Sequence, residues 1–272
     1  MNCLEIILIL VFFSLLRALT CHPLLGVIGV FCTVKDVIQR RIVRNTWFRQ
    51  GEICSLQSRD SSCAFIAVFV LGEPGSSSEE GFHDLVVLKG VPENMDNGKS
   101  LAWLKFAFKE FPKASMVFKT DIDTIVNTAV LLSTFSPLPT ADFVYFGFAN
   151  DFFVCGRSNH CPKGWTYMSG AFYGISARFS SCVQRWPSGL IGPEDLVVGR
   201  LLRGCSETLL LFPCNRPGQL CPFAHPVKSS QRFLALWTQR LNWKSVLDSV
   251  AVDLAASNKR RERENSIILG LV

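Results

Sequence analysis

The 272-residue sequence predicts an α/β/α sandwich built on one mostly parallel central sheet. Short apolar runs, typical of buried strands, alternate along the chain with segments of helical periodicity. With 49% hydrophobic and 18% charged residues, the chain is also apolar enough to bury a sizeable core. In such a sheet, ligands gather at the carboxyl ends of the strands.

The apolar runs and the periodic segments divide the chain into alternating elements. Strands are expected at residues 24–33, 63–71, 84–88, 143–148 and 208–212, and one more runs from Met116 to a pair of aspartates. Helices are expected at residues 35–48, 99–110, 124–135 and 176–186, and a last one opens at Pro193.

The first helix, residues 35–48, has an apolar side and a basic side. The apolar stripe predicted to face the sheet is Val37, Ile38, Ile42, Val43 and Trp47. The basic side is Arg40, Arg41, Arg44 and Arg49, which composition alone predicts to be a solvated face.

The formal net charge of +6 comes from scattered basic residues with few aromatic residues between them. This pattern indicates a surface that tolerates anionic ligands, and it predicts no nucleic-acid interface.

Eleven cysteines indicate an oxidising compartment, and the spacing contains no pair of Cys-x-x-Cys motifs that would favour a zinc site. Plausible disulfides are Cys155–Cys161, Cys54–Cys63 and two of Cys205, Cys214 and Cys221. The odd count leaves a thiol over, for which Cys3 is the candidate.

An apolar run from Ile6 to Leu16 is short for a membrane span and predicts a signal peptide or a short signal anchor. We therefore expect a leader at residues 1–20, a catalytic domain at 21–253 and a charged tail at 254–272. Either form of the leader would direct the chain to the secretory pathway.

Asp121 and Asp123 follow the strand that begins at Met116. Residues i and i+2 of an extended chain point the same way, so the two carboxylates can reach one Mg²⁺ or Mn²⁺ ion and its diphosphate. The alternative is that these aspartates cap a turn and the helix that begins near Thr124.

Two later segments carry further candidates. Trp165, Tyr167 and Tyr173, with Gly170 between them, predict either an aromatic surface for a sugar or ordinary core packing. Glu194 and Asp195 open a helix. The alternative is that they only interact favourably with the helix dipole and have no other role.

Taken together, seven stretches in order resemble the family 31 inverting glycosyltransferases, the β-1,3-galactosyl- and β-1,3-N-acetylglucosaminyltransferases of the Golgi, over roughly residues 23–237. The stretches are 40–47 (Arg-Arg-Ile-Val-Arg-Asn-Thr-Trp), 69–72, 80–103 with Lys99 and Trp103, 119–123 (Lys-Thr-Asp-Ile-Asp), 167–176, 194–199 (Glu-Asp-Leu-Val-Val-Gly), and His225 with Trp237.

The resemblance implies a GT-A type, Rossmann-like fold and a role for each candidate. Asp121, Asp123 and His225 would bind Mn²⁺ or Mg²⁺. Asp195 would be the general base, with Glu194 beside it. Arg44, Lys99 and Asp121 would contact the donor nucleotide, and Trp165, Tyr167 and Gly170 the sugars.

The same resemblance implies partners and location. The donor would be UDP-galactose or UDP-N-acetylglucosamine, and the acceptor a glycan on a glycoprotein or glycolipid. The enzyme would be a single-pass type II protein of the Golgi membrane with a luminal catalytic domain. Two departures mark a divergent member: Ile122 replaces the middle acid of the metal triplet, and residues 91–97 replace the motif expected before Lys99.

Two other functions fit part of the pattern. A phosphotransferase of the haloacid-dehalogenase type also places Asp-x-Asp after a strand, but it wants Thr or Val where Ile125 stands. An inactive, lectin-like relative would bind sugar without transferring it, and Ile122 is the residue that favours this reading.

Overall fold

The computed structural model describes residues 24–54, 56, 63–73, 83–136, 142–152, 165–206, 208–214 and 221–224. The expected leader, the charged tail, His225 and Trp237 lie outside these residues. No helix within the described ranges is long and apolar enough to cross a membrane.

The main sheet runs in the order β2-β3-β1-β5-β8-β7-β9, and β4 pairs with β3 along the same edge as β2. Its strands are β1 Gly26–Phe31, β2 Ile53–Cys54, β3 Phe65–Glu73, β4 Leu85–Pro92, β5 Met116–Asp121, β7 Val144–Phe152, β8 Trp165–Ser176 and β9 Leu210–Pro213. Among these strands only β8 runs antiparallel to its neighbours, β5 and β7. The predicted α/β fold with a mostly parallel sheet is confirmed.

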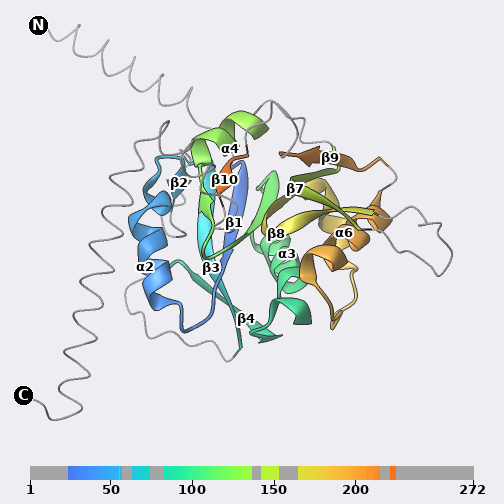
Figure 1. Cartoon of the computed structure of the whole chain (residues 1–272), viewed down its shortest axis with the longest axis horizontal. Helices are drawn as coiled ribbons and strands as arrows, with labels where there is room; N and C mark the ends of the chain where they lie inside the picture. The colour runs from blue at the N-terminus through green and yellow to red at the C-terminus, as the bar shows by residue number, and fades with distance from the viewer. Residues whose placement is uncertain are drawn as a thin grey trace, which may run out of the picture.

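Helices cover both faces of this sheet (Figure 1). One face packs against α3 Lys99–Glu110, α5 Ser180–Gln184 and α6 Glu194–Cys205. The other face packs against α2 Val37–Asn45, the 3₁₀ turn η1 Trp47–Arg49 and α4 Thr128–Phe135. Because side chains alternate along β5, Lys119 and Asp121 point to the α3–α6 face while Phe118 belongs to the other core.

Three predicted elements need correction. The helix predicted at 124–135 begins later, because Ile125–Val126 forms strand β6, which pairs with β10 Phe223–Ala224 in a small antiparallel sheet. Asn127 then caps α4 by accepting a hydrogen bond from the Val130 amide at 3.0 Å. The helix predicted at 176–186 is a 3₁₀ turn, η3 Ala177–Phe179, followed by the short α5.

The third correction concerns the face that α2 buries. Val37 and Ile38 are 42% and 39% exposed, whereas Arg40 of the predicted solvated face is fully buried. The Arg40 guanidinium donates to the backbone carbonyls of Thr33 and Val34, just after β1. The carbonyls of Thr33 and Val34 need hydrogen-bond donors, and Arg40 supplies them. This requirement, and not the apolar stripe, decides which side of α2 is buried.

Three disulfides join described cysteines. Cys54–Cys63 is confirmed, and Cys214–Cys221 falls within the predicted set. Cys205 instead pairs with Cys182, a cysteine missing from the predicted pairs, and this bond ties α5 to α6. Cys155 and Cys161 lie outside the described residues.

Candidate active site

The two predicted metal carboxylates lie at the carboxyl end of β5. The Asp121 side chain is 24% exposed and Asp123 is exposed. Ile122, between them, packs against the apolar core on the α2–α4 side. The turn here is closed by the Asp121 backbone carbonyl, which accepts from the Thr124 amide at 3.1 Å, and the helix is capped by Asn127. The Asp121 carboxylate is therefore not a cap.

The Asp121 carboxylate is held by Lys119, the first residue of the 119–123 stretch, for which the sequence predicted no role of its own. Lys119 is fully buried, and its Nζ donates to Asp121 Oδ1 at 2.7 Å, to Glu194 Oε1 at 2.8 Å and to the Gly170 carbonyl. Burial alone would lower the pKa of Lys119, but the carboxylates of Glu194 and Asp121 outweigh burial and raise it. Lys119 is thus a permanent buried cation.

The β5 motif also holds the backbone of β8 where the two strands separate. Their pairing ends at Thr120 and Phe172. Beyond it, the Gly170 carbonyl accepts from Lys119, and the Ala171 carbonyl accepts from the hydroxyls of Thr120 and Thr124, each at 3.1 Å. Side chains of Lys119, Thr120 and Thr124 therefore make the hydrogen bonds to β8 that the β5 backbone no longer makes.

Glu194 and Asp195 stand in the first turn of α6, directly above this part of β8. Glu194 is nearly enclosed, and its Oε2 accepts from the Tyr173 hydroxyl at 3.0 Å. Asp195 accepts from the Leu196 amide at 2.8 Å and from the Gly170 amide at 3.3 Å. Both acids thus have specific partners in addition to the helix dipole.

The pKa of Asp195 is raised above its ordinary value. Partial burial is the main cause and the charge of Glu194 adds to it, while the two amides and Lys119 act in the opposite direction. A half-buried carboxylate of raised pKa is suited to accept a proton.

The aromatic segment divides into buried and accessible rings. Tyr173 is fully buried and serves the core and Glu194, whereas Trp165 and Tyr167 are half-buried on one side of β8. The space that a Cβ would take at Gly170 is filled by Glu194 Oε1, 2.6 Å away. Gly170 therefore allows α6 to approach closely, and its contact with a sugar stays a prediction.

The two basic donor candidates are already engaged in ion pairs. Arg44 pairs with Asp84, and its guanidinium lies 4.9 Å from the centre of the Phe69 ring. Lys99 is buried, pairs with Glu93 and donates to the Cys32 carbonyl at 2.9 Å. Their contact with a nucleotide also stays a prediction.

His225, the third expected metal ligand, lies outside the described residues. Within those residues, no three His, Cys, Asp or Glu side chains gather in a way that would hold a metal ion. Ala224, the residue before His225, pairs with Ile125, two positions after Asp123.

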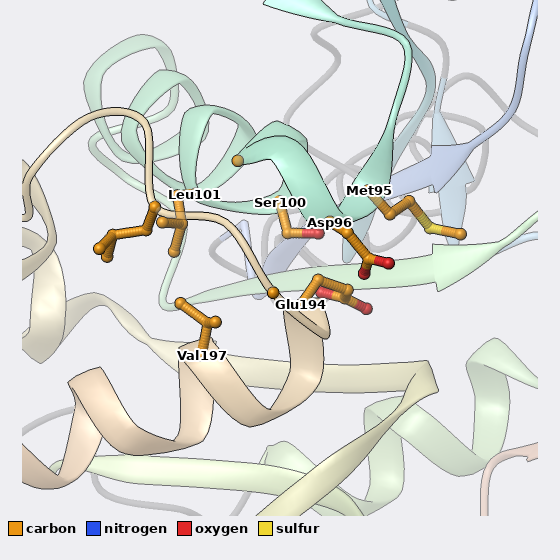
Figure 2. Close-up of a pocket in the computed structure, with 9 residues that line it drawn as sticks. Met95, Asp96, Ser100, Leu101, Glu194 and Val197 are labelled. Atoms are coloured by element: carbon orange, nitrogen blue, oxygen red, sulfur yellow. The ribbon is translucent and has the colours of Figure 1, made fainter.

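Two cavities lie beside the N-terminus of α3. Figure 2 shows the smaller one, where Glu194 faces Asp96 and Ser100; its volume of about 10 Å³ suits a single water and is far too small for a sugar. A cleft of about 520 Å³ adjoins it, and Gly98 and Leu101 line both. The wall of the larger cleft includes Ile191, which is 78% exposed.

Sequence reasoning missed the role of Lys119, named only as the first residue of the 119–123 stretch, and the hydrogen bond from the buried Tyr173 to Glu194. The available signal was a charged residue inside the apolar run Met-Val-Phe-Lys-Thr, because a lysine in a buried strand requires partners.

Several solved structures are similar to this chain at low identity. A glycosyltransferase involved in glycosylation of the major capsid of PBCV-1 is 10% identical, with a TM-score of 0.40, and the alignment covers 79% of this chain and 99% of that one. The galactosyltransferase LgtC, in complex with donor and acceptor sugar analogs, is 10% identical with a TM-score of 0.43 and coverage of 81% and 99%. The glycosyltransferase GlyE of Streptococcus pneumoniae TIGR4 is 11% identical, with a TM-score of 0.43 and coverage of 84% and 63%.

No curated protein sequence matches the chain. Residues 38–206, however, match the family model described as galactosyltransferase. Because this match spans more than half of the 272 residues, the chain belongs to the galactosyltransferase family, the family 31 glycosyltransferases, and is a glycosyltransferase.

Proposed function

We propose that this glycosyltransferase moves galactose or N-acetylglucosamine from a UDP-sugar to a glycan hydroxyl, with inversion, to form a β-1,3 linkage. The observation that carries the proposal is that Asp121 and Asp195 are joined at one end of the sheet. Asp121 is bonded to Lys119, which holds the Gly170 carbonyl, and the Gly170 amide donates to Asp195. Such a transfer requires a carboxylate on the donor side, here Asp121, and a base for the acceptor hydroxyl, here Asp195 with its raised pKa.

Asp121 and Asp123 fit part of the ligand set of Mn²⁺ or Mg²⁺. Both offer hard oxygen atoms, and among the described residues Asp121 engages only Oδ1, in its bond to Lys119. His225 would complete the protein ligands. When bound, the ion would neutralise charge on the leaving diphosphate.

Asp195 would act on the acceptor. Its carboxylate takes the proton of the acceptor hydroxyl as that oxygen forms a bond to the anomeric carbon of the donor. The bond from that carbon to the diphosphate oxygen breaks, and UDP leaves with the electron pair. A single displacement of this kind inverts an α-linked donor to a β-glycoside.

The remaining candidates would bind the two substrates. Trp165 and Tyr167, both half-buried on β8, would stack on sugar rings, and Tyr167 is close enough to Asp195 for that charge to raise its pKa. Arg44 and Lys99 would act in the nucleotide region. The acceptor would be a glycan on a glycoprotein or glycolipid, in the lumen of the Golgi; the three disulfides support an oxidising compartment.

The test uses the full chain, Mn²⁺ and each UDP-sugar in turn, with a panel of glycan acceptors, and measures released UDP with and without chelator. Metal-dependent release from UDP-galactose or UDP-N-acetylglucosamine is expected, and linkage analysis of the product should give a β-1,3 bond. The Asp195→Asn variant should lose turnover while it still binds UDP. If Asp195→Asn keeps near wild-type turnover, Asp195 is not the general base.

One observation favours a second function. Because Ile122 packs into the apolar core, it contributes nothing to a metal site. A lectin-like relative would bind UDP in a metal-dependent way and release none from any donor. If UDP does not bind at all, the assignment of the site is wrong.

A further inference from the structure

Lys119 lies where three parts of the active site meet. It belongs to β5, and its ammonium group contacts Asp121 on the same strand, the Gly170 carbonyl of β8 and Glu194 of α6. We propose that Lys119 is a positioning residue, which fixes the base Asp195 relative to the donor-side carboxylate Asp121. This inference rests on the proposed function, in which Asp195 is the base.

The first support is that the ammonium group has no spare donor. Its three N–H groups meet three acceptors, and the side chain has no exposed surface. Nζ also lies 5.4 Å and 5.9 Å from the ring centres of Phe31 and Tyr173. A normally flexible side chain is therefore held in one place.

The second support is that two short paths lead from Lys119 to Asp195. One passes through Glu194, which is adjacent to Asp195 in α6 and is held on its other side by the Tyr173 hydroxyl. The other passes through Gly170, whose carbonyl is bound by Lys119 and whose amide is bound by Asp195. The strand and the helix are thus fixed together at the base.

The third support is charge. The groups that face Asp195 are Glu194 on its own helix, Lys119 on β5, Tyr167 on β8 and Tyr145 on β7. Lys119 is the only cation among these named groups, and it lowers the pKa of Asp195 against the effects of burial and Glu194. Removal of this cation should therefore make Asp195 harder to ionise.

The test compares Lys119→Met, Lys119→Arg and Lys105→Met in the full chain. Lys105 is a matched control, because it also donates to a backbone carbonyl, that of Trp186 at 2.6 Å, but lies outside this cluster. For each variant we would measure the melting temperature, UDP binding, kcat and KM, and the pH dependence of kcat/KM.

We expect Lys119→Met to bind UDP and to lose about 10²-fold in kcat, the loss typical of a misplaced catalytic group. Its activity should also fall away at a higher pH than in the wild type as the solution is acidified. Lys119→Arg keeps the positive charge, so it should have the wild-type pH profile but only part of the wild-type kcat. Lys105→Met should leave both unchanged.

Carbon-13 NMR of the Asp195 carboxyl, assigned with Asp195→Asn, gives a readout that needs no turnover. If the wild type transfers nothing, the proposed function fails, and this titration still decides whether Lys119 controls Asp195. A folded Lys119→Met with an unchanged Asp195 titration would overturn the proposal. If Lys119→Met does not fold, Lys119→Gln decides: we expect UDP binding with reduced kcat and an Asp195 titration at higher pH, and an unchanged titration would overturn the proposal.

Discussion

Arg44 and Asp84 form a two-point ion pair that joins α2 to the residue before β4. Arg44 Nε lies 2.7 Å from Asp84 Oδ2, and Nη2 lies 2.8 Å from Oδ1. Only 12% and 13% of the two side chains are exposed, so this pair is worth more than a typical surface salt bridge.

Arg44→Lys should therefore reduce stability, because an ammonium cannot make both hydrogen bonds in this geometry. We expect the free energy of unfolding in urea to fall by about 1.5–3 kcal/mol, the range for a hydrogen bond to a charged group. Arg41→Lys, on the exposed side of the same helix, is the control and should change little. Equal losses in the two variants would contradict this account of the pair.

The acid side of the activity profile should report Asp195. A general base works only when deprotonated, so turnover falls as the pH drops through its pKa, and that pKa is raised by burial and by Glu194. The fall in kcat/KM should therefore begin at a higher pH than for an ordinary aspartate of pKa 3.8. A profile that stays flat down to that value would show that Asp195 is not the base.

Gly170→Ala should disturb the site by steric contact alone. The new Cβ would stand 2.6 Å from Glu194 Oε1 and must push that carboxylate away from Lys119. We expect a loss of about 1–3 kcal/mol from overpacking, together with reduced kcat. Gly204→Ala, in α6 with open space around it, should instead stabilise the helix by about 0.5–1 kcal/mol. Thermal unfolding and turnover of both variants test this contrast.

The Cys182–Cys205 disulfide should stabilise α6 against α5. The bond closes 23 residues, so its removal by a double Cys→Ala change should cost about 3 kcal/mol in the free energy of unfolding. Removal of Cys54–Cys63, which spans 9 residues, should cost about 0.8 kcal/mol less on the same chain-entropy argument. Denaturant unfolding measures both, and the reverse order would contradict the argument.

Cys32 should be an unreactive thiol in the folded protein. It is buried directly after β1 and makes no disulfide in the described part of the chain. Burial raises its pKa to about 11, although Arg40 acts in the opposite direction. At pH 8 almost no thiolate is present, so alkylation of Cys32, followed by peptide mass spectrometry, should be detected only after unfolding. Rapid labelling of the native protein would refute this.

Part of the sheet could be predicted because several strands are buried on both faces and leave unbroken apolar runs, whereas β8 Trp165–Ser176, only partly buried over its first half, was not predicted. Phe65–Glu73 and Met116–Asp121 are of this kind, and α3 was predicted with its observed bounds, Lys99–Glu110. The Ile125–Val126 strand was missed because two β-branched residues form a strand only when a distant partner is present, here β10.

The sequence predicted the acidic residues of the candidate site but not the residues that hold them in place. Asp121, Glu194 and Asp195 could be found from motifs, but Lys119 and Arg40 are buried for reasons that lie elsewhere in the chain. Each supplies donors to carbonyls of another segment, Gly170 for Lys119 and Thr33 for Arg40. Periodicity describes one segment at a time and does not include such requirements.

The cluster around Lys119 has a consequence for how the sequence can change over time. If Lys119 or Glu194 is replaced singly, a buried charge is left behind without its partner, whereas a joint replacement by apolar residues removes both charges. Gly170 depends on the same pair, because any larger residue there displaces Glu194. Positions 119, 170 and 194 should therefore vary together or not at all, although 51 residues separate the first two and 75 separate the first from the last.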